Sequence, residues 1–166
     1  AIYFHGNRAR AGRRRVHYAP FFFPLDAIDN WNRLYGRSGM YQYQCVIPSA
    51  NGAQATRALL DRIAHSGQGS FLAVLKIFGP LTSQGLLSFP REGVTLALDF
   101  PNRGASTLSL LSGLDEIVRS AGGRLYPAKD GRISASMFAA GYPNLPQFCE
   151  HLDPGLSSSF WRRVRP

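Results

Sequence analysis

The chain has 166 residues, of which 45% are hydrophobic and 17% are charged. That composition is too apolar for a disordered chain, and the length suits one domain with a core of its own. No run approaches the ~20 apolar residues of a membrane helix, and two cysteines cannot build a disulfide framework or a cysteine zinc cluster.

The net charge of +9 comes almost entirely from the two ends. Eight arginines carry it there, namely Arg8, Arg10, Arg13, Arg14, Arg15, Arg162, Arg163 and Arg165. A basic end can bind nucleic acid or anionic lipid, but we favour solvated ends or junctions to further protein. The start at Ala1, without a methionine, indicates a fragment or a processed product. No signal peptide is visible, so a cytoplasmic or membrane-associated protein is expected rather than a secreted one.

The first forty residues show little periodicity. Phe21–Phe23 precede Pro24, which predicts an extended segment. The stretch 25–34 is expected to form a helix with Asp26 as its N-cap.

From residue 41 the pattern alternates between strands and helices. Runs of β-favouring residues predict strands over 41–48, 71–78, 94–100 and 124–126. Apolar residues three or four apart predict helices over 53–65 and 106–121. The order β-α-β-β-α-β predicts a ferredoxin-like α+β fold, an antiparallel sheet with two helices on one face. An N-terminal extension precedes it, and a C-terminal helical tail, with a helix at 133–140, should pack on other structure.

Side chains alternate along a strand, so each strand has two faces. Wholly apolar sets should lie under the helices: Tyr43, Cys45 and Ile47; Phe71, Ala73, Leu75 and Ile77; Val94, Leu96, Leu98 and Phe100. The opposite face mixes polar and apolar groups: Gln42, Gln44, Lys76, Thr95, Ala97 and Asp99 with Leu72, Val74 and Phe78. Such a mixture suits a ligand pocket. An ordinary solvated face, or one covered by another domain, is the alternative.

The common catalytic motifs are absent: the sequence contains no G-x-G-x-x-G, Walker loop, H-E-x-x-H or G-x-S-x-G. The four histidines have no ligand spacing, so no metal site is predicted. Cys45 falls on the helix side and is expected to be a buried structural thiol. Redox chemistry would therefore need a cofactor.

Six blocks of the sequence carry a resemblance to a known family. They are Pro24–Gly36, Tyr41–Pro48, Ser70–Pro80, Leu87–Pro90, Leu98–Pro101 and Gly123–Arg132. In this order and spacing they resemble the decaprenylphosphoryl-β-D-ribose 2′-oxidase family, FAD-dependent oxidoreductases of the vanillyl-alcohol-oxidase type. The resemblance implies that residues 1–123 are a substrate-binding (cap) domain lacking its N-terminal part. Residues 124–166 would return to an FAD-binding domain that this sequence lacks and that holds most of the FAD.

The resemblance also assigns roles to individual residues. It implies substrate-binding positions at Gln42, Gln44, Lys76, Leu72, Val74, Phe78, Thr95 and Ala97, and catalytic positions beside flavin at Tyr126 and Lys129. Ala97 stands where mycobacterial members have a cysteine, which excludes covalent trapping there. Thr95 and Phe23 replace an asparagine and a histidine.

The predicted function of the parent enzyme is oxidation of a secondary alcohol of a sugar or polyol by hydride transfer to FAD. The substrate would be a small sugar or a polyprenyl-phospho-sugar, and a reductase partner would complete an epimerisation. Lys129 would stabilise developing negative charge, and Tyr126 would position the substrate. The chain alone should be inactive, and its uncovered sheet face is prone to self-association.

Two alternatives are weighed against this function. RNA-recognition domains share the β-α-β-β-α-β order, but they stack bases on aromatic residues of the open face. Here the third strand presents Thr95, Ala97 and Asp99 on that face, so no nucleic-acid partner is expected. A non-catalytic interaction domain is the other alternative, and the presence of Tyr126 and Lys129 argues against it.

Overall fold

The computed structural model describes residues 5, 12–13, 15–23, 26–27, 29–30, 33, 35–129 and 131–166. It divides into two compact units, residues 1–36 and residues 37–166. Among the described residues, no helix is long and apolar enough to cross a membrane.

The first unit contains a short helix, α2, at Tyr18–Phe22. Its N-cap is His17, whose Nδ1 accepts a hydrogen bond from the backbone N–H of Ala19 at 3.3 Å. The prediction of an extended segment at Phe21–Phe23 is therefore wrong for its first two residues. The cap satisfies a backbone donor of the first turn, and this local bond outweighs the β preference of consecutive phenylalanines.

The helix expected over 25–34 is not found at the positions that are described. Residues 26, 27, 29 and 30 form turns, and residues 33 and 35 lie in 3₁₀ geometry. The rest of the range lies outside the described residues. Asn30 has a φ of +54°, in the left-handed region, and a continuous right-handed helix cannot pass through such a residue. Asp26 consequently does not cap a helix of this length.

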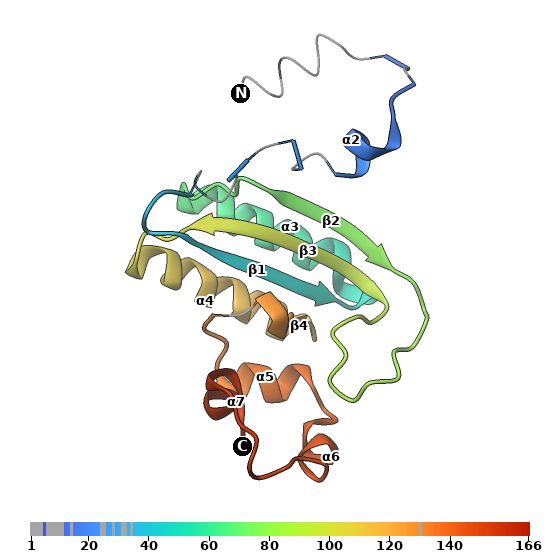
Figure 1. Cartoon of the computed structure of the whole chain (residues 1–166), viewed down its shortest axis with the longest axis vertical. Coiled ribbons are helices and arrows are strands. Elements are labelled where there is room, and N and C mark those ends of the chain that lie inside the picture. The colour runs from blue at the N-terminus through green and yellow to red at the C-terminus, as the bar shows by residue number, and fades with distance from the viewer. Residues whose placement is uncertain are drawn as a thin grey trace. The chain divides into compact units, whose positions relative to one another are not determined.

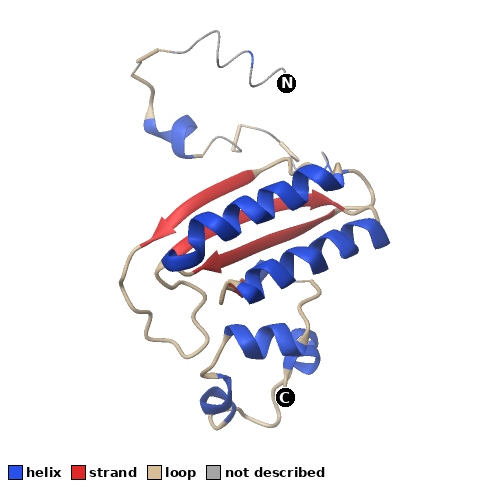
Figure 2. Cartoon of the chain, turned by 180° about the vertical axis from the view of Figure 1, so that it is seen from behind, coloured by secondary structure: helices blue, strands red, loops and turns tan. Residues whose placement is uncertain are grey.

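The second unit has the predicted ferredoxin-like α+β architecture. Its elements are β1 (Met40–Ile47), α3 (Ser49–Ser66), β2 (Ala73–Phe78), β3 (Gly93–Pro101), α4 (Ala105–Ser120) and β4 (Arg124–Leu125). The strands form one antiparallel sheet in the order β2-β3-β1-β4. Helices α3 and α4 lie on the same side of it, as Figures 1 and 2 show from opposite directions.

Two connections of this unit require glycine, one at the end of α3 and one at the start of β3. Gly67 ends α3 with a φ of +66°, a left-handed C-cap that residues with a side chain rarely adopt. Gly93 begins β3 with a φ of +147°, and a Cβ there would lie 2.0 Å from the carbonyl oxygen of Ile47. The start of β3 can therefore approach the end of β1 only because residue 93 has no side chain.

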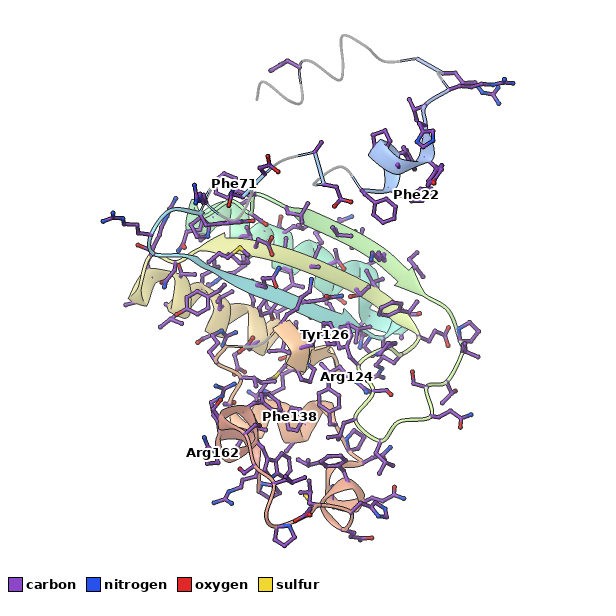
Figure 3. The ribbon with its side chains drawn as sticks, viewed as in Figure 1. Phe22, Phe71, Arg124, Tyr126, Phe138 and Arg162 are labelled. Carbon is purple, nitrogen blue, oxygen red and sulfur yellow. The ribbon has the colours of Figure 1, made fainter. Side chains whose placement is uncertain are left out.

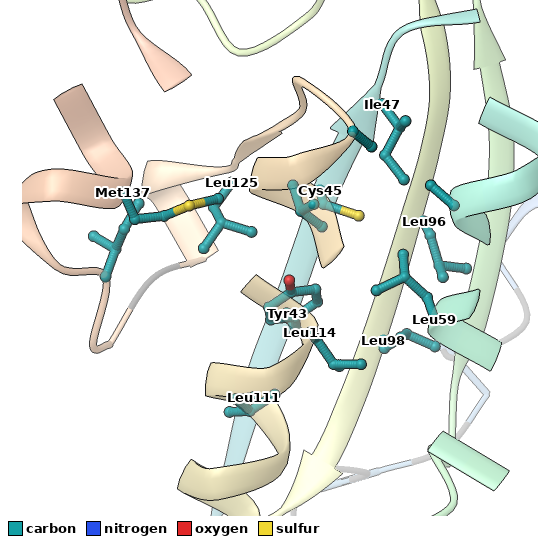
Figure 4. Packing of buried hydrophobic residues seen from close by; sticks show 14 of the residues in the cluster. Tyr43, Cys45, Ile47, Leu59, Leu96, Leu98, Leu111, Leu114, Leu125 and Met137 are labelled. Carbon is teal, nitrogen blue, oxygen red and sulfur yellow. The ribbon is translucent and has the colours of Figure 1, made fainter. Parts of the chain in front are cut away.

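The hydrophobic core lies between the sheet and the two helices (Figure 4). Tyr43, Cys45 and Ile47 of β1 meet Leu59 of α3 and Leu114 of α4, and all five are buried. The apolar sets predicted to lie under the helices are thus confirmed for β1 and for Leu96, Leu98 and Phe100 of β3. Burial also raises the pKa of the Cys45 thiol to about 12, in keeping with a structural role.

The prediction that the apolar side chains of β2 lie under the helices is wrong. Leu75 and Ile77 point to the helix side, since they pair with Leu96 and Val94 of β3, but they are 59% and 81% exposed. Phe71, just before the strand, is 66% exposed. The reason is that β2 is the edge strand, whereas α3 packs on β3 and β1.

The C-terminal tail completes the same core. It contains a 3₁₀ turn, η2 (Pro127–Lys129), and the helices α5 (Ala135–Gly141), α6 (Leu145–Cys149) and α7 (Ser159–Val164). Helix α5 packs on β4 and α4, and Phe138, Tyr142 and Val164 join the main hydrophobic cluster. The tail therefore packs on the sheet's own end, and α5 confirms the helix predicted at 133–140. The two later helices were not predicted.

An ion pair also fastens the tail. The guanidinium of Arg132 donates two hydrogen bonds of 2.7 Å to the carboxylate of Asp115 on α4. Both side chains are more than four-fifths buried. This bidentate pair ties the segment after η2 to the helical layer.

Candidate substrate-binding face

The strand register brings most of the predicted site residues onto one side of the sheet. Directly opposed residues of antiparallel strands point to the same face. One row across the sheet contains Lys76, Thr95, Val46 and Arg124, and the next contains Val74, Ala97 and Gln44. These side chains face away from α3 and α4, because the residues between them fill the core. We call this side of the sheet the open face.

Hydrogen bonds from β1 to β3 orient the two glutamines of the open face. Gln44 donates from Nε2 to the Thr95 hydroxyl at 3.1 Å. Gln42 donates from Nε2 to the Asp99 carboxylate at 3.3 Å. Each bond uses one amide N–H, so the second N–H and the carbonyl oxygen of each amide are the groups suited to a ligand. Thr95, predicted as a substrate contact, therefore also positions Gln44.

Three aromatic side chains, Phe78, Phe89 and Tyr126, cover one end of the open face. Val46 and Thr95 are 0% and 1% exposed although they point away from the helices. The ring of Phe89 stacks on Tyr126 at 4.5 Å and 24° and meets Phe78 edge-on at 6.2 Å. Because Phe78 ends β2 and Tyr126 follows β4, the loop 79–92 spans this end of the sheet. Phe89 is a site residue that the prediction missed, and its place in the block Leu87–Pro90 was the available signal.

Tyr126 lies beside Gln44, and Lys129 lies one turn further along. The backbone N–H of Tyr126 donates to the carbonyl of Gln44 at 2.8 Å, and that of Lys129 donates to the carbonyl of Tyr126 at 3.1 Å. Both side chains are half-buried. In the described part of the chain, no hydrogen bond or ion pair joins the Lys129 ammonium to the open face. Asp130, the alternative partner for this lysine, lies outside the described residues.

The remaining predicted positions are distributed as follows. Lys76 is solvent-exposed on the outer strand, whereas Val74, Phe78 and Ala97 are half-buried on the open face. Leu72 precedes β2 and is 41% exposed. The open face therefore presents an ammonium, two amides and an aromatic patch over three neighbouring strands, as a surface rather than a closed cavity.

Arg124 is a second residue that the prediction missed. It lies on the open-face row with Val46, near Tyr126 and beside the β2–β3 loop (Figure 3). Its Nη1 donates to the carbonyl of Ser88 at 3.0 Å, and its guanidinium lies 5.1 Å from the centre of the Tyr142 ring. Burial and the nearby Arg91 lower the pKa of Arg124. Its signals in the sequence were its place in the block Gly123–Arg132 and its position as a charged residue at the start of a short strand.

The described residues contain no group of three or more His, Cys, Asp or Glu side chains that could hold a metal ion. The fold and the open face together define a ferredoxin-like domain whose sheet presents one mixed polar and aromatic surface.

Comparison with known proteins agrees with the predicted resemblance. No family model matches the chain. The chain is 41% identical over 128 residues to the decaprenylphosphoryl-beta-D-ribose oxidase of Mycolicibacterium smegmatis, a match that covers 77% of this chain and 27% of that protein. It is 36% identical over 144 residues to the uncharacterized protein in mprA 5′region of Streptomyces coelicolor, covering 86% of this chain and 37% of that protein. The resemblance is thus confirmed, and the chain spans between about a quarter and two-fifths of these relatives' lengths.

Proposed function

We propose that the chain is the substrate-binding part of an FAD-dependent oxidoreductase that oxidises a secondary alcohol of a sugar or polyol. The observation that carries this proposal is the shared orientation of Gln44, Lys76 and Tyr126 on the open face. It is supported by the 41% identity to an oxidase whose name gives a ribose derivative as its substrate.

The residues of the open face fit one side of a flavin ring with a polyol between them. The ring of Tyr126, backed by the buried Phe89, offers a flat apolar surface, while Gln42, Gln44 and Lys76 offer directional polar groups. Amides suit sugar hydroxyls because each amide can donate and accept at once. No phosphate-binding glycine loop occurs in the sequence, so we assign most of the FAD contacts to protein outside this chain. FAD, when bound, supplies the hydride acceptor.

The residues would divide the work as follows. Gln44 and Lys76 hold the sugar by hydrogen bonds, and Val74, Phe78 and Ala97 form the apolar wall. Tyr126 positions the reacting hydroxyl or relays its proton. Lys129 places positive charge beside that oxygen and stabilises the negative charge that develops as hydride leaves.

The domain assignment belongs to the same proposal. Residues 1–123 are part of a substrate-binding domain, and 124–166 lead back to the FAD-binding domain. The exposed helix-side residues Leu75 and Ile77 fit an apolar face that other parts of the parent protein would cover. A polyprenyl-phospho-sugar is the favoured substrate because the relative's name describes one. A reductase acting on the ketone product would complete an epimerisation.

The test is Lys129→Ala in the full-length enzyme. Stopped-flow measurement of flavin reduction by substrate should show a loss of about 10²- to 10³-fold, the usual cost of removing an electrostatic stabiliser. Arg119→Ala is the matched control, because Arg119 lies on the helical layer and pairs with Glu116. A wild-type reduction rate in the Lys129 variant would contradict the assigned role. The isolated chain should show no flavin absorption, and a yellow preparation would contradict the domain assignment.

A further inference from the structure

A polar hollow lies beside the open face, between the β2–β3 loop and the start of the tail. It encloses about 290 Å³. Its polar lining consists of Arg91, Arg124, Thr82, Ser83, Ser88 and Asn144, with Glu92 at the same wall. Two guanidinium groups, three hydroxyls and one amide thus converge on one small volume. All of these groups can donate hydrogen bonds.

Among the described residues, the two arginines of the hollow donate hydrogen bonds to backbone carbonyl groups and not to carboxylates. Arg91 donates from Nη1 to the carbonyl of Gly122 at 3.1 Å, and Arg124 donates from Nη1 to that of Ser88 at 3.0 Å. The ion pairs among the described residues are Arg119 with Glu116 and Arg132 with Asp115. Within the described part of the chain, the positive charge of the hollow is therefore not neutralised by a paired carboxylate.

The surroundings of the Arg124 guanidinium add to this observation. Its Nε atom is buried and has no hydrogen-bond partner among the described residues. A buried donor without a partner costs free energy, and Arg91 adds like-charge repulsion, which lowers the pKa of Arg124 together with burial. An anion in the hollow would relieve the repulsion between the two guanidinium groups, whereas the buried Nε atom, which has almost no accessible surface, does not itself line the hollow.

We propose that this hollow binds a phosphate group, and specifically the phosphodiester of a phosphorylated sugar substrate held on the open face. The inference rests on the proposed function for the sugar, and it adds the place of the phosphate. Arginine forks match phosphate oxygens in pairs, and the hydroxyls of Ser83 and Thr82 supply further donors. Glu92 also lines the hollow and is exposed, so the anion is expected toward the two arginines.

The hollow and the open face share their walls. Arg124 stands on the open-face row with Val46 and Thr95, two residues before Tyr126. Ser88, whose carbonyl holds Arg124, is followed by Phe89, which stacks on Tyr126. A sugar beside Tyr126 would therefore extend its phosphate toward Arg124. The rival explanation is that Arg124 only clamps the loop through Ser88 and Tyr142.

Binding of simple phosphates to the 166-residue chain separates the two explanations. The ¹⁵N–¹H signal of Arg124 Nε would be followed by NMR during titration with dimethyl phosphate, a singly charged diester, and with inorganic phosphate. Phosphate binding predicts a saturable shift with dimethyl phosphate. Arg91→Gln, which removes the guanidinium that the loop contributes to the hollow, should weaken this binding about tenfold, the loss of one charge-assisted hydrogen bond. Arg119→Gln should leave it unchanged.

Each other result overturns the inference. No saturable shift, or the same affinity in Arg91→Gln, would leave Arg124 as a clamp. Binding of inorganic phosphate alone would assign the hollow to free phosphate and not to a substrate ester. These outcomes do not depend on oxidation. In the full-length enzyme, Arg91→Gln should raise KM for a phosphorylated sugar about tenfold with little change in kcat. An enzyme that oxidises no sugar alcohol but whose chain still binds dimethyl phosphate would refute the proposed function alone.

Discussion

Phe89 attaches the β2–β3 loop to the sheet, and its replacement by alanine tests that attachment. The side chain is 5% exposed and contacts the rings of Phe78 and Tyr126. Truncating a buried phenylalanine to alanine costs about 3–5 kcal/mol. Because the loop can partly collapse into the space, we expect the lower end, about 3 kcal/mol. That is a large part of the 5–15 kcal/mol typical of a small domain, so the variant should fold but unfold at lower urea concentration.

Urea denaturation of the 166-residue chain, followed by circular dichroism, would measure the change. Leu81→Ala is the matched control, since Leu81 is in the same loop but is 89% exposed, and it should change stability by less than about 0.5 kcal/mol. A double-mutant cycle of Phe89→Leu with Tyr126→Leu should give a coupling of about 0.5–1.5 kcal/mol for the stacked rings. A loss below about 1 kcal/mol in Phe89→Ala would show that the loop is not held on the open face.

Three further predictions concern the fold that supports the open face. Arg132→Met should destabilise the chain by about 2–4 kcal/mol in urea, because it leaves Asp115 buried and unpaired, and Asp115→Leu in the same chain should recover most of the loss. Gly93→Ala should cost more than about 2 kcal/mol in the same assay, since its Cβ would meet the Ile47 carbonyl; Gly69→Ala, with open space around it, should cost little. At pH 8 a thiol reagent should modify Cys149 but not Cys45 until the chain unfolds. Since burial raises the pKa of Cys45 to about 12 only in the folded state, stability should fall by about 1.4 kcal/mol per pH unit from this group above about pH 9, and Cys45→Ala should show a shallower fall.

The elements of residues 40–141 could be predicted because their signals are local. Alternation along β1 and β3 depends only on the geometry of a strand, and it correctly divided Gln44 from Cys45 and Thr95 from Leu96. The apolar spacing of α3 and α4 likewise depends only on the helical repeat. With four strands and two helices in a β-α-β-β-α-β order, few topologies remain. The ferredoxin-like sheet was therefore accessible from the sequence.

Other features depend on contacts between distant segments, and the sequence carries weak signals for them. The pattern of β2 shows that Leu75 and Ile77 are apolar and point to the same side of the sheet. It does not show that α3 packs on β3 and β1 and leaves these two side chains uncovered. The residues 18–22 form a helix because His17 offers an acceptor to one backbone N–H, a contact that hydrophobic patterning does not contain.

In the candidate site, too, residues placed by strand alternation were predicted, and residues placed by contacts between distant segments were not. Gln42, Gln44 and Lys76 were found because strand alternation places them. Phe89 was missed because it lies in a loop, and Arg124 was missed because β4 has only two residues, too few to show alternation. Loop 79–92 has no repeating pattern, and its position follows from two contacts far apart in the sequence, the stack of Phe89 on Tyr126 and the bond from Arg124 to Ser88. Alternation can therefore predict which side chains line a sheet face, but the shape of the pocket above it depends on loop contacts. The phosphate proposed to bind at Arg91 and Arg124 is common to all phosphorylated sugars, so the loop that carries Arg91 would select phosphorylated over free sugars, whereas Gln44 and Lys76, which alternation does place, would select the sugar itself.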